Sequence, residues 1–332
     1  MSLRLMKKVA ISAFDLFEKK FSHAFFKSFR EKNALIVFLI HVLFHDKKEI
    51  DLNFVNSEGR ITIQNFRQFV EYYLSNGYTF VSPNDILNGL DSNKKYILIT
   101  FDDGYFNNQY ALPILKEYQI PAVFFISTNH IVYNKCFWWD VLYRKRIKQG
   151  ISVRNIMRET THLKSKTNEG IEKYIKDLFG KDAFKPISDI DRVLTPLELK
   201  DFSNEKYVFL GNHTSDHAIL TNYSQDGIRS QILNAQTTIY DITGITPIII
   251  SYPNGNYSDE VIRISKEIGL KLGITVDSRK NYLPIEFEND VYMRLGRFIL
   301  QGDDGFIEQL ESFRLNKGIR KIIKNIKSSL KR

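Results

Sequence analysis

The chain is most constrained by short apolar runs with strand character that alternate with helical stretches. Such runs are too short and too rich in β-branched residues to favour helices, so we interpret them as buried strands. They are residues 34–44, 78–81, 96–101, 121–127, 207–210, 247–252 and 272–276. Strand, helix and strand in succession require a parallel crossover connection. The order therefore predicts an α/β fold in which a parallel sheet closes, or nearly closes, into a barrel.

One segment interrupts this alternation. Residues 136 to about 205 are polar, mostly helical in pattern and rich in Lys, Glu and Asn, and Thr195 followed by Pro196 and Glu198 is typical of the start of a helix. A chain of 332 residues is long enough for one barrel-sized domain or two smaller ones. We interpret the segment as a helical insertion carried on the barrel domain.

The net charge of +9 is concentrated at the two ends of the chain. Residues 314–332 contain eight basic residues and no acidic one, and residues 1–32 carry +5, so residues 33–313 carry −4. A mildly acidic body argues against nucleic acid as a partner. We therefore expect an amphipathic helical lead-in over 1–32, the barrel over 33–313 and a basic amphipathic helix over 314–332.

The last of these helices suits an anionic membrane surface, because Ile319, Ile322, Ile323, Ile326 and Leu330 share a face between lysines. The alternative is a solvated helix packed on the barrel. The longest apolar run has eleven residues, too few to span a bilayer, and the start of the chain does not resemble a secretory signal. We expect a cytoplasmic protein that rests on the inner membrane leaflet.

Three of the apolar strands run directly into unusual polar clusters. These clusters are Asp102-Asp103-Gly104, residues 211–217 and residues 251–255. In a parallel barrel all three would emerge at the same rim, which is where catalytic groups collect. The sequence therefore predicts a site built from segments more than a hundred residues apart.

Two histidines in the second cluster, His213 and His217, are four residues apart, so a helical turn or tight loop would aim both imidazoles at one point. Two imidazoles and one carboxylate form a three-ligand metal site with a position left for water, suited to zinc or a similar divalent ion. Alone, such a pair is more often solvent-facing, and Asp-Asp-Gly is often a surface turn. Together, after strands, these residues favour a metal site.

These clusters carry a resemblance. With Thr100 to Gly104, His213 to His217 and Tyr252 to Gly255 in this order, the chain resembles the polysaccharide deacetylase family (carbohydrate esterase family four) from about residue 36 to 298. The resemblance implies a distorted (β/α) barrel with fewer than eight strands and metal-dependent removal of an acyl group from an N-acyl amino sugar.

The same resemblance implies roles for individual residues: Asp102 as general base, Asp103, His213 and His217 as metal ligands, and the backbone N–H of Asn254 in the oxyanion hole. It implies a divalent metal, with zinc as the first choice and cobalt, nickel or manganese as alternatives. The implied partner is an N-acetylated glycan, either a surface polysaccharide or a lipid-linked precursor.

The chain departs from the family pattern in two places. Ser251 stands where many members have an arginine, and the late histidine that serves many members as general acid is missing. Further residues expected to line the site are His41, Thr214, Tyr252, Tyr105, Trp139 and Arg294. Each has a plainer alternative: core packing, a turn hydroxyl or, for Arg294 and the nearby Arg297, structural ion pairing.

Two other hypotheses remain at this stage. The missing late histidine favours a non-catalytic relative that binds a glycan or a protein partner at the same rim. A metallohydrolase of a non-sugar amide would use the same four residues, Asp102, Asp103, His213 and His217.

Overall fold

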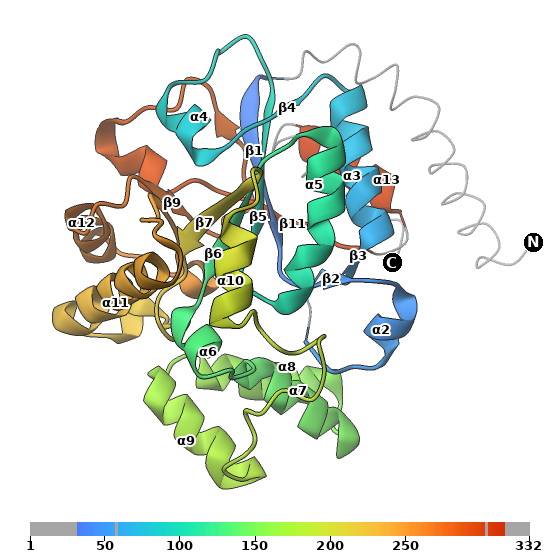
Figure 1. The fold of residues 1–332 in the computed structure, drawn as a ribbon, viewed down its shortest axis with the longest axis vertical. Helices are drawn as coiled ribbons and strands as arrows, with labels where there is room; N and C mark the ends of the chain where they lie inside the picture. Colours follow the sequence, from blue (N-terminus) through green and yellow to red (C-terminus); the bar gives the residue numbers. More distant parts are fainter. Residues whose placement is uncertain (1–31, 57–58, 303–304, 316–332) are drawn as a thin grey trace, which may run out of the picture. The chain divides into compact units, whose positions relative to one another are not determined.

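The computed structural model describes residues 32–56, 59–302 and 305–315 (Figure 1). It divides into a body, Ala34–Asp304, and a second unit formed by the chain ends, in which the described helix is α13 (Phe306–Arg314). The helices expected over residues 1–32 and 314–332 lie almost wholly outside the described residues.

Six parallel strands form the main part of the barrel, and they lie side by side in chain order (Figure 1). They are β1 (Ala34–Ile40), β5 (Tyr96–Phe101), β6 (Ala122–Ile126), β7 (Val208–Asn212), β8 (Ile249–Ser251) and β9 (Leu272–Ile274). All seven residues of β1 and all six of β5 are buried, as expected for strands covered on both faces.

A short late segment closes the ring. Leu295 forms a parallel bridge with Ile274 of β9, and β11 (Phe298–Ile299) then pairs in parallel with β1. The same stretch of chain thus joins the last strand of the series to the first. This arrangement confirms the distorted (β/α) barrel with fewer than eight strands.

Four two-residue strands extend this frame. β4 (Thr79–Phe80) pairs with the start of β5, and β10 (Asn281–Tyr282) runs antiparallel to β1. β2 (Leu43–Phe44) and β3 (Ile61–Thr62) form a separate small sheet.

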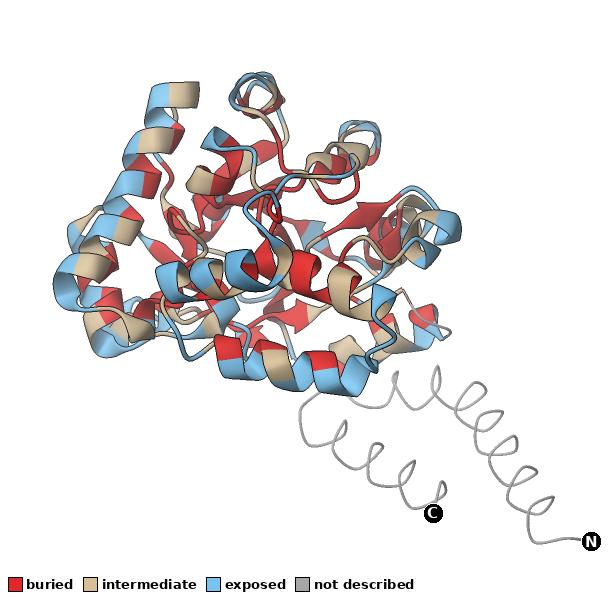
Figure 2. Ribbon diagram, turned by 90° about the horizontal axis from the view of Figure 1, so that it is seen from below, coloured by how far each residue is buried: buried red, intermediate tan, exposed pale blue. Residues whose placement is uncertain are grey.

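Amphipathic helices cover the outside of the barrel, with their buried residues turned inward (Figure 2). They are α3 (Ile63–Ser75), α4 (Pro83–Leu87), α5 (Leu112–Tyr118), α6 (Thr128–Val132), α10 (Pro196–Ser203), α11 (Gln225–Thr243) and α12 (Asp259–Glu267). The short α2 (Lys47–Asp51) has no buried residue. In α3 the residues at helical spacing Phe66, Phe69, Val70 and Tyr73 are buried, whereas Leu74, expected on the same face, is exposed. The chain after β5 first forms a 3-10 turn, Phe106–Ala111, and then continues into α5.

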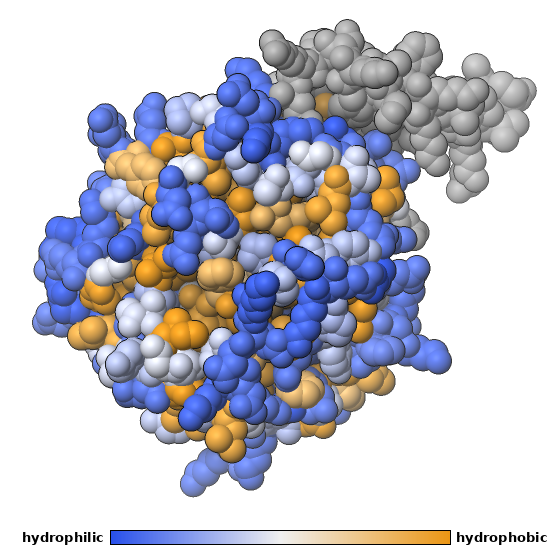
Figure 3. Space-filling model, turned by 45° about the horizontal axis from the view of Figure 1, so that its top comes forward, coloured by the Kyte–Doolittle hydropathy of each residue, from blue (hydrophilic) through white to orange (hydrophobic). Residues whose placement is uncertain are grey.

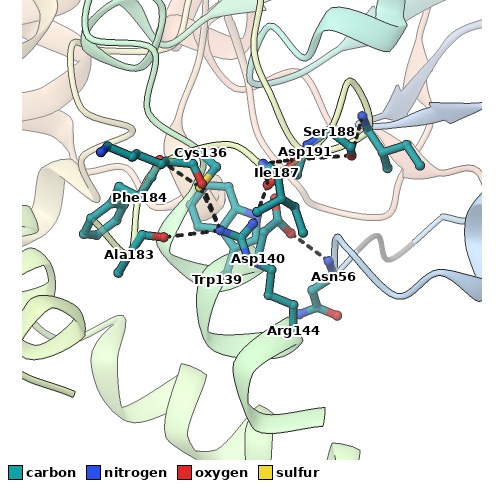
Figure 4. Close-up of polar contacts among 12 residues, drawn as sticks. Asn56, Cys136, Trp139, Asp140, Arg144, Ala183, Phe184, Ile187, Ser188 and Asp191 are labelled. Carbon is teal, nitrogen blue, oxygen red and sulfur yellow. Dashed lines mark hydrogen bonds and ion pairs between the residues drawn. The ribbon is translucent and has the colours of Figure 1, made fainter. Parts of the chain in front are cut away.

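Within the span expected to be an insertion, three helices gather at one end of the barrel, below it in Figure 1. These are α7 (Trp138–Lys148), α8 (Val153–Leu163) and α9 (Asn168–Phe179), which share an apolar core of their own. Figure 4 shows the polar network that joins α7 to the segment after α9: Arg144 of α7 forms a buried ion pair with Asp191 and donates to the carbonyl of Ala183. Asp191 also accepts the backbone N–H groups of Ile187 and Ser188.

The surface of the body is mixed. On the face brought forward in Figure 3, groups of hydrophobic residues alternate with hydrophilic side chains, as is usual for globular domains. Among the described residues, none of the helices combines the length and the apolar character needed to cross a bilayer.

Candidate active site

The two adjacent carboxylates emerge at the end of β5. The backbone N–H of Asp102 continues the ladder by donating to the carbonyl of Ile40, 3.0 Å away. Asp103 and Gly104 then adopt positive φ angles of 80° and 84°. This left-handed turn costs little for glycine but is strained for aspartate. Because of this turn, the neighbouring side chains of Asp102 and Asp103 lie in different surroundings.

Asp103, His213 and His217 come together as the sequence predicts. Their ligand atoms all lie within 4.8 Å of one another. Oδ1 of Asp103 is 3.4 Å from Nε2 of His213 and 3.5 Å from Nε2 of His217. Asp103 and His213 are almost completely buried, and the His217 side chain is 14% exposed. One small cation can therefore contact all three.

The unsatisfied atoms of this cluster fit a metal ion. Both carboxylate oxygens of Asp103 and Nε2 of His213 are buried without a hydrogen-bond partner, a costly state for polar atoms unless something binds them. The other ring nitrogen of His213, Nδ1, lies 2.7 Å from the carbonyl of Ser251. A proton on Nδ1 leaves the Nε2 lone pair for a metal.

The loop between the two histidines is fixed by hydrogen bonds. The Asn212 side chain accepts the backbone N–H of Thr214 and donates to Gln236 of α11. The Thr214 hydroxyl accepts the backbone N–H of Ala218 at 2.8 Å, which ties together the two sides of the loop. Thr214 and His217 both have positive φ angles, 64° and 52°. The histidines therefore converge through a tight, strained loop rather than along a helix.

Asp102, in contrast to Asp103, is fully engaged. Arg297, itself 2% exposed, donates Nη1–H to Oδ1 at 2.8 Å and Nη2–H to Oδ2 at 2.6 Å. The Ser251 hydroxyl lies 3.1 Å from Oδ2 and 2.9 Å from Arg297 Nη2, so it links both partners. Ser251 occupies the place where the family pattern has an arginine, and Arg297 supplies the guanidinium from the segment that closes the barrel.

The charges of these groups act on one another. Burial opposes ionisation of Asp102, but the Arg297 guanidinium and His213 hold the pKa of Asp102 well below its usual range. Burial also opposes a charge on His213, but Asp102 and Asp103 outweigh it and raise its pKa. For His217, burial and the neighbouring His213 and His130 lower the pKa. Asp102 is therefore ionised at neutral pH, as a general base requires.

The cluster opens into a cavity of about 280 Å³ between the barrel rim and the insertion. Of the residues expected to line the site, His41, Tyr105 and Trp139 do so, and Asn254, expected in the oxyanion hole, lines it too. Trp139 packs on the site, with its ring 4.6 Å from that of His217. Asn254 has a positive φ of 58°, and no hydrogen bond from its backbone N–H to a described residue is present.

The structure places two other expected lining residues elsewhere. The Tyr252 hydroxyl donates to the Met293 carbonyl inside the apolar core, and the ring is fully buried there. Arg294 points outward and pairs with exposed Asp259 at 2.6 Å. Strand alternation explains Tyr252, because its neighbour Ser251 faces the site.

Sequence reasoning missed Asp140 of α7 and did not favour Arg297 as a partner of Asp102. Asp140 is fully buried and accepts the Tyr105 hydroxyl at 2.6 Å and the Asn56 backbone N–H at 2.7 Å. Burial raises the pKa of Asp140 to about 7. The sequence feature that could have indicated Arg297 is Ser251. Because Ser251 replaces the arginine that many family members have at this position, a buried Asp102 needs a cation from another part of the chain.

Fold and site together define a (β/α) barrel protein with an Asp-His-His cluster and a neighbouring ionised carboxylate at the carboxyl rim. The family model of the polysaccharide deacetylases matches residues 89–273, more than half of the chain. The chain belongs to the polysaccharide deacetylase family, as the motif resemblance predicts.

Individual proteins agree with this assignment. The chain is 22% identical to YxkH of Bacillus subtilis over 223 residues, which are 66% of this chain and 59% of that protein. The structure resembles the Streptococcus pyogenes deacetylase PplD with a TM-score of 0.57 and 17% identity, over 84% of this chain and 99% of that one. It also resembles IcaB from Ammonifex degensii, with a TM-score of 0.55 and 16% identity over 86% and 99% of the two chains. The structural likenesses establish the shared fold.

Proposed function

We propose that the protein is a metal-dependent hydrolase that removes an acetyl or other acyl group from an N-acyl amino sugar. The observation that carries the proposal is the pairing of an unsatisfied Asp103-His213-His217 cluster with the ionised Asp102 beside it. Family membership supports the substrate class. The glycan is a surface polysaccharide or a lipid-linked precursor.

In this mechanism Asp103, His213 and His217 hold the ion, with zinc as the first choice. A bound divalent ion would supply Lewis-acid activation of the attacking water and of the amide oxygen. Asp102 takes the proton of the water as it attacks the carbonyl carbon. Arg297 and Ser251 keep Asp102 ionised and correctly oriented before the reaction begins. The backbone N–H of Asn254 donates to the oxygen that becomes negative in the tetrahedral intermediate.

The leaving amine needs a proton, and we assign its delivery to His41. His41 lies just beyond β1 and lines the same cavity as Asp102 and His217. His41→Gln should lower kcat more than it raises KM. The matched variant His45→Gln, at an exposed histidine four residues away, should behave as the wild type; equal kinetics for both variants would remove His41 from the mechanism.

The proposal is tested by acetate release from N-acetylated glucosamine oligosaccharides. The wild type should release acetate, Asp102→Asn should lose nearly all activity, and Asp201→Asn at an exposed carboxylate should retain it. Bound metal without turnover on any amide or ester would instead favour the non-catalytic glycan-binding function, which the missing late histidine favours. Turnover of non-sugar amides alone would favour a different metallohydrolase.

The membrane part of the proposal rests on residues 314–332, which lie almost wholly outside the described part of the chain. Their eight basic residues with no acidic one suit an anionic leaflet. In liposome flotation, the full chain should bind anionic vesicles better than a chain truncated before residue 314. Equal vesicle binding by the full and truncated chains would contradict a membrane-binding role for residues 314–332.

A further inference from the structure

The wall of the cavity opposite the barrel rim is built by the insertion and carries two lysines. Lys164 and Lys166 lie in the connection between α8 and α9 and line the same cavity as Asp102, Asp103 and His217. Lys164 is half-buried, and Lys166 is exposed. Because these lysines come from the insertion, the barrel motifs assign them no role.

Hydrogen bonds hold the connection between α8 and α9, which carries both lysines, against the loop that follows His217. The Asn222 side chain donates to the backbone carbonyls of Lys164 and Lys166, at 2.9 and 3.0 Å. One residue further on, the Tyr223 hydroxyl accepts the backbone N–H of Asn168 at 2.7 Å. Three hydrogen bonds thus fix the lysine-bearing backbone to a segment five residues beyond His217. The backbone that carries the two lysines is therefore held beside the site.

Neither ammonium group is neutralised within the described part of the chain. No ion pair or side-chain hydrogen bond of Lys164 or Lys166 is present among the described residues. The acidic residues that line the cavity are Asp102 and Asp103. Arg297 engages the first, and the second belongs to the metal cluster. Nearby Glu169 lines a separate surface hollow with Lys173 and Lys181.

The charges that line the cavity therefore favour an anion. Two carboxylates face three cations, Arg297, Lys164 and Lys166, and a divalent ion held by Asp103 would add two positive charges. An excess of positive charge in a partly enclosed site raises the local concentration of anionic ligands. Lysine binds phosphate and carboxylate groups as a point charge on a flexible stem, without the fixed geometry of arginine.

We infer that the substrate is an N-acyl amino sugar bearing an anionic substituent, a phosphate ester or a carboxylate, which Lys164 and Lys166 bind while the acyl group lies at the metal cluster. The placement of the acyl group at the Asp103-His213-His217 cluster rests on the proposed deacetylase function. The cavity volume of about 280 Å³ falls near the lower end for small-molecule sites, which suits a single sugar unit with its substituents.

The test compares three probes with the same sugar ring: N-acetylglucosamine 1-phosphate, the carboxylate-bearing N-acetylmuramic acid and the neutral methyl glycoside of N-acetylglucosamine. Dissociation constants are measured by NMR titration of the full chain carrying Asp102→Asn, which prevents turnover. At low salt at least one anion should bind about five- to tenfold more tightly than the neutral sugar. This preference should shrink as salt is added. The anion that is preferred identifies the substituent.

The double variant Lys164→Gln/Lys166→Gln should lose the preference and leave binding of the neutral sugar unchanged. The control Lys94→Gln, at an exposed lysine that does not line the cavity, should keep it. Equal binding of all three probes by the Asp102→Asn chain, or a preference that survives when the two lysine substitutions are added to it, would overturn the inference. Acetate release from neutral glycans with no anion preference would refute this inference alone, whereas anion binding without hydrolysis would refute only the proposed function.

Discussion

The two walls of the cavity differ in how they are built. The barrel wall presents Asp102 and Asp103, with His213 buried behind them; all three are 1–2% exposed and held by strand ends and strained turns. The insertion wall presents Trp139, Lys164 and other side chains that are partly exposed and have few polar partners. On the proposed function, the barrel wall holds the reacting groups, whereas the insertion wall contacts the rest of the substrate. Changes to the first wall should affect turnover, and changes to the second should affect binding.

The largest effect is expected for His217→Ala. Loss of one of three ligands should remove most of the bound metal and lower activity more than about 100-fold, since even partners that only orient a ligand affect metal sites 10–100-fold. Metal content per chain and acetate release measure the two effects. His162→Ala, at an exposed histidine of α8, is the control. Full metal content in His217→Ala would contradict the role of His217 as a metal ligand.

Arg297→Met should have the next largest effect. It leaves the buried carboxylate of Asp102 unpaired and should destabilise the fold by about 3–5 kcal/mol, measured by chemical denaturation. Because Arg297 lowers the pKa of Asp102, its loss should also move the acid limb of the activity profile to higher pH.

Two further variants sharpen this prediction. Arg297→Lys keeps the charge without the two-pronged geometry and should be intermediate. Arg294→Met removes an exposed pair with Asp259 and should cost less than about 1 kcal/mol. Equal losses of unfolding free energy for Arg294→Met and Arg297→Met would show that the buried Asp102–Arg297 pair contributes no more to stability than an exposed pair.

On the insertion wall, Trp139→Ala should raise KM about tenfold and change kcat less, because it removes a ring on which a sugar can pack. Steady-state kinetics separate the two constants. Tyr133→Ala, at an exposed aromatic residue, should leave both unchanged. A loss confined to kcat would place Trp139 with the reacting groups instead.

The smallest effect on turnover is expected for Asp140→Asn, which is best followed through stability. Burial raises the pKa of Asp140 to about 7, above the value of about 4 in the unfolded chain. The folded state therefore binds the proton more tightly, and stability should fall as pH rises from about 4 to about 7. Denaturation curves across this window should show the decline in the wild type and a flatter dependence in Asp140→Asn. Parallel dependences would contradict a protonated, buried Asp140.

Much of the barrel wall could be predicted from the sequence. Unbroken apolar strands ending in polar clusters placed Asp103, His213 and His217 at one rim, because the register of parallel strands leaves little choice. The two-residue strand β11 that closes the barrel, and the inward turn of Arg297 beside the outward Arg294, depend on pairing between distant segments. The local sequence pattern does not predict which distant segments pair.

The insertion wall was less predictable. The sequence indicated helices over residues 136–205 but not which side chains would face the barrel. The approach of Lys164 and Lys166 to the site depends on contacts made by Asn222 and Tyr223, whose polar groups look like those of an ordinary loop. The burial of Asp140 likewise follows only from how α7 packs against Tyr105.

The most direct test of the account is a metal titration of the metal-free protein followed by acetate release from an N-acetylated glucosamine oligosaccharide. Activity should rise in proportion to added zinc, level off at about one ion per chain as a single three-ligand site requires, and stay absent in Asp103→Asn. Acetate release that is independent of metal, or undiminished in Asp103→Asn, would contradict a reaction centred on Asp103, His213 and His217.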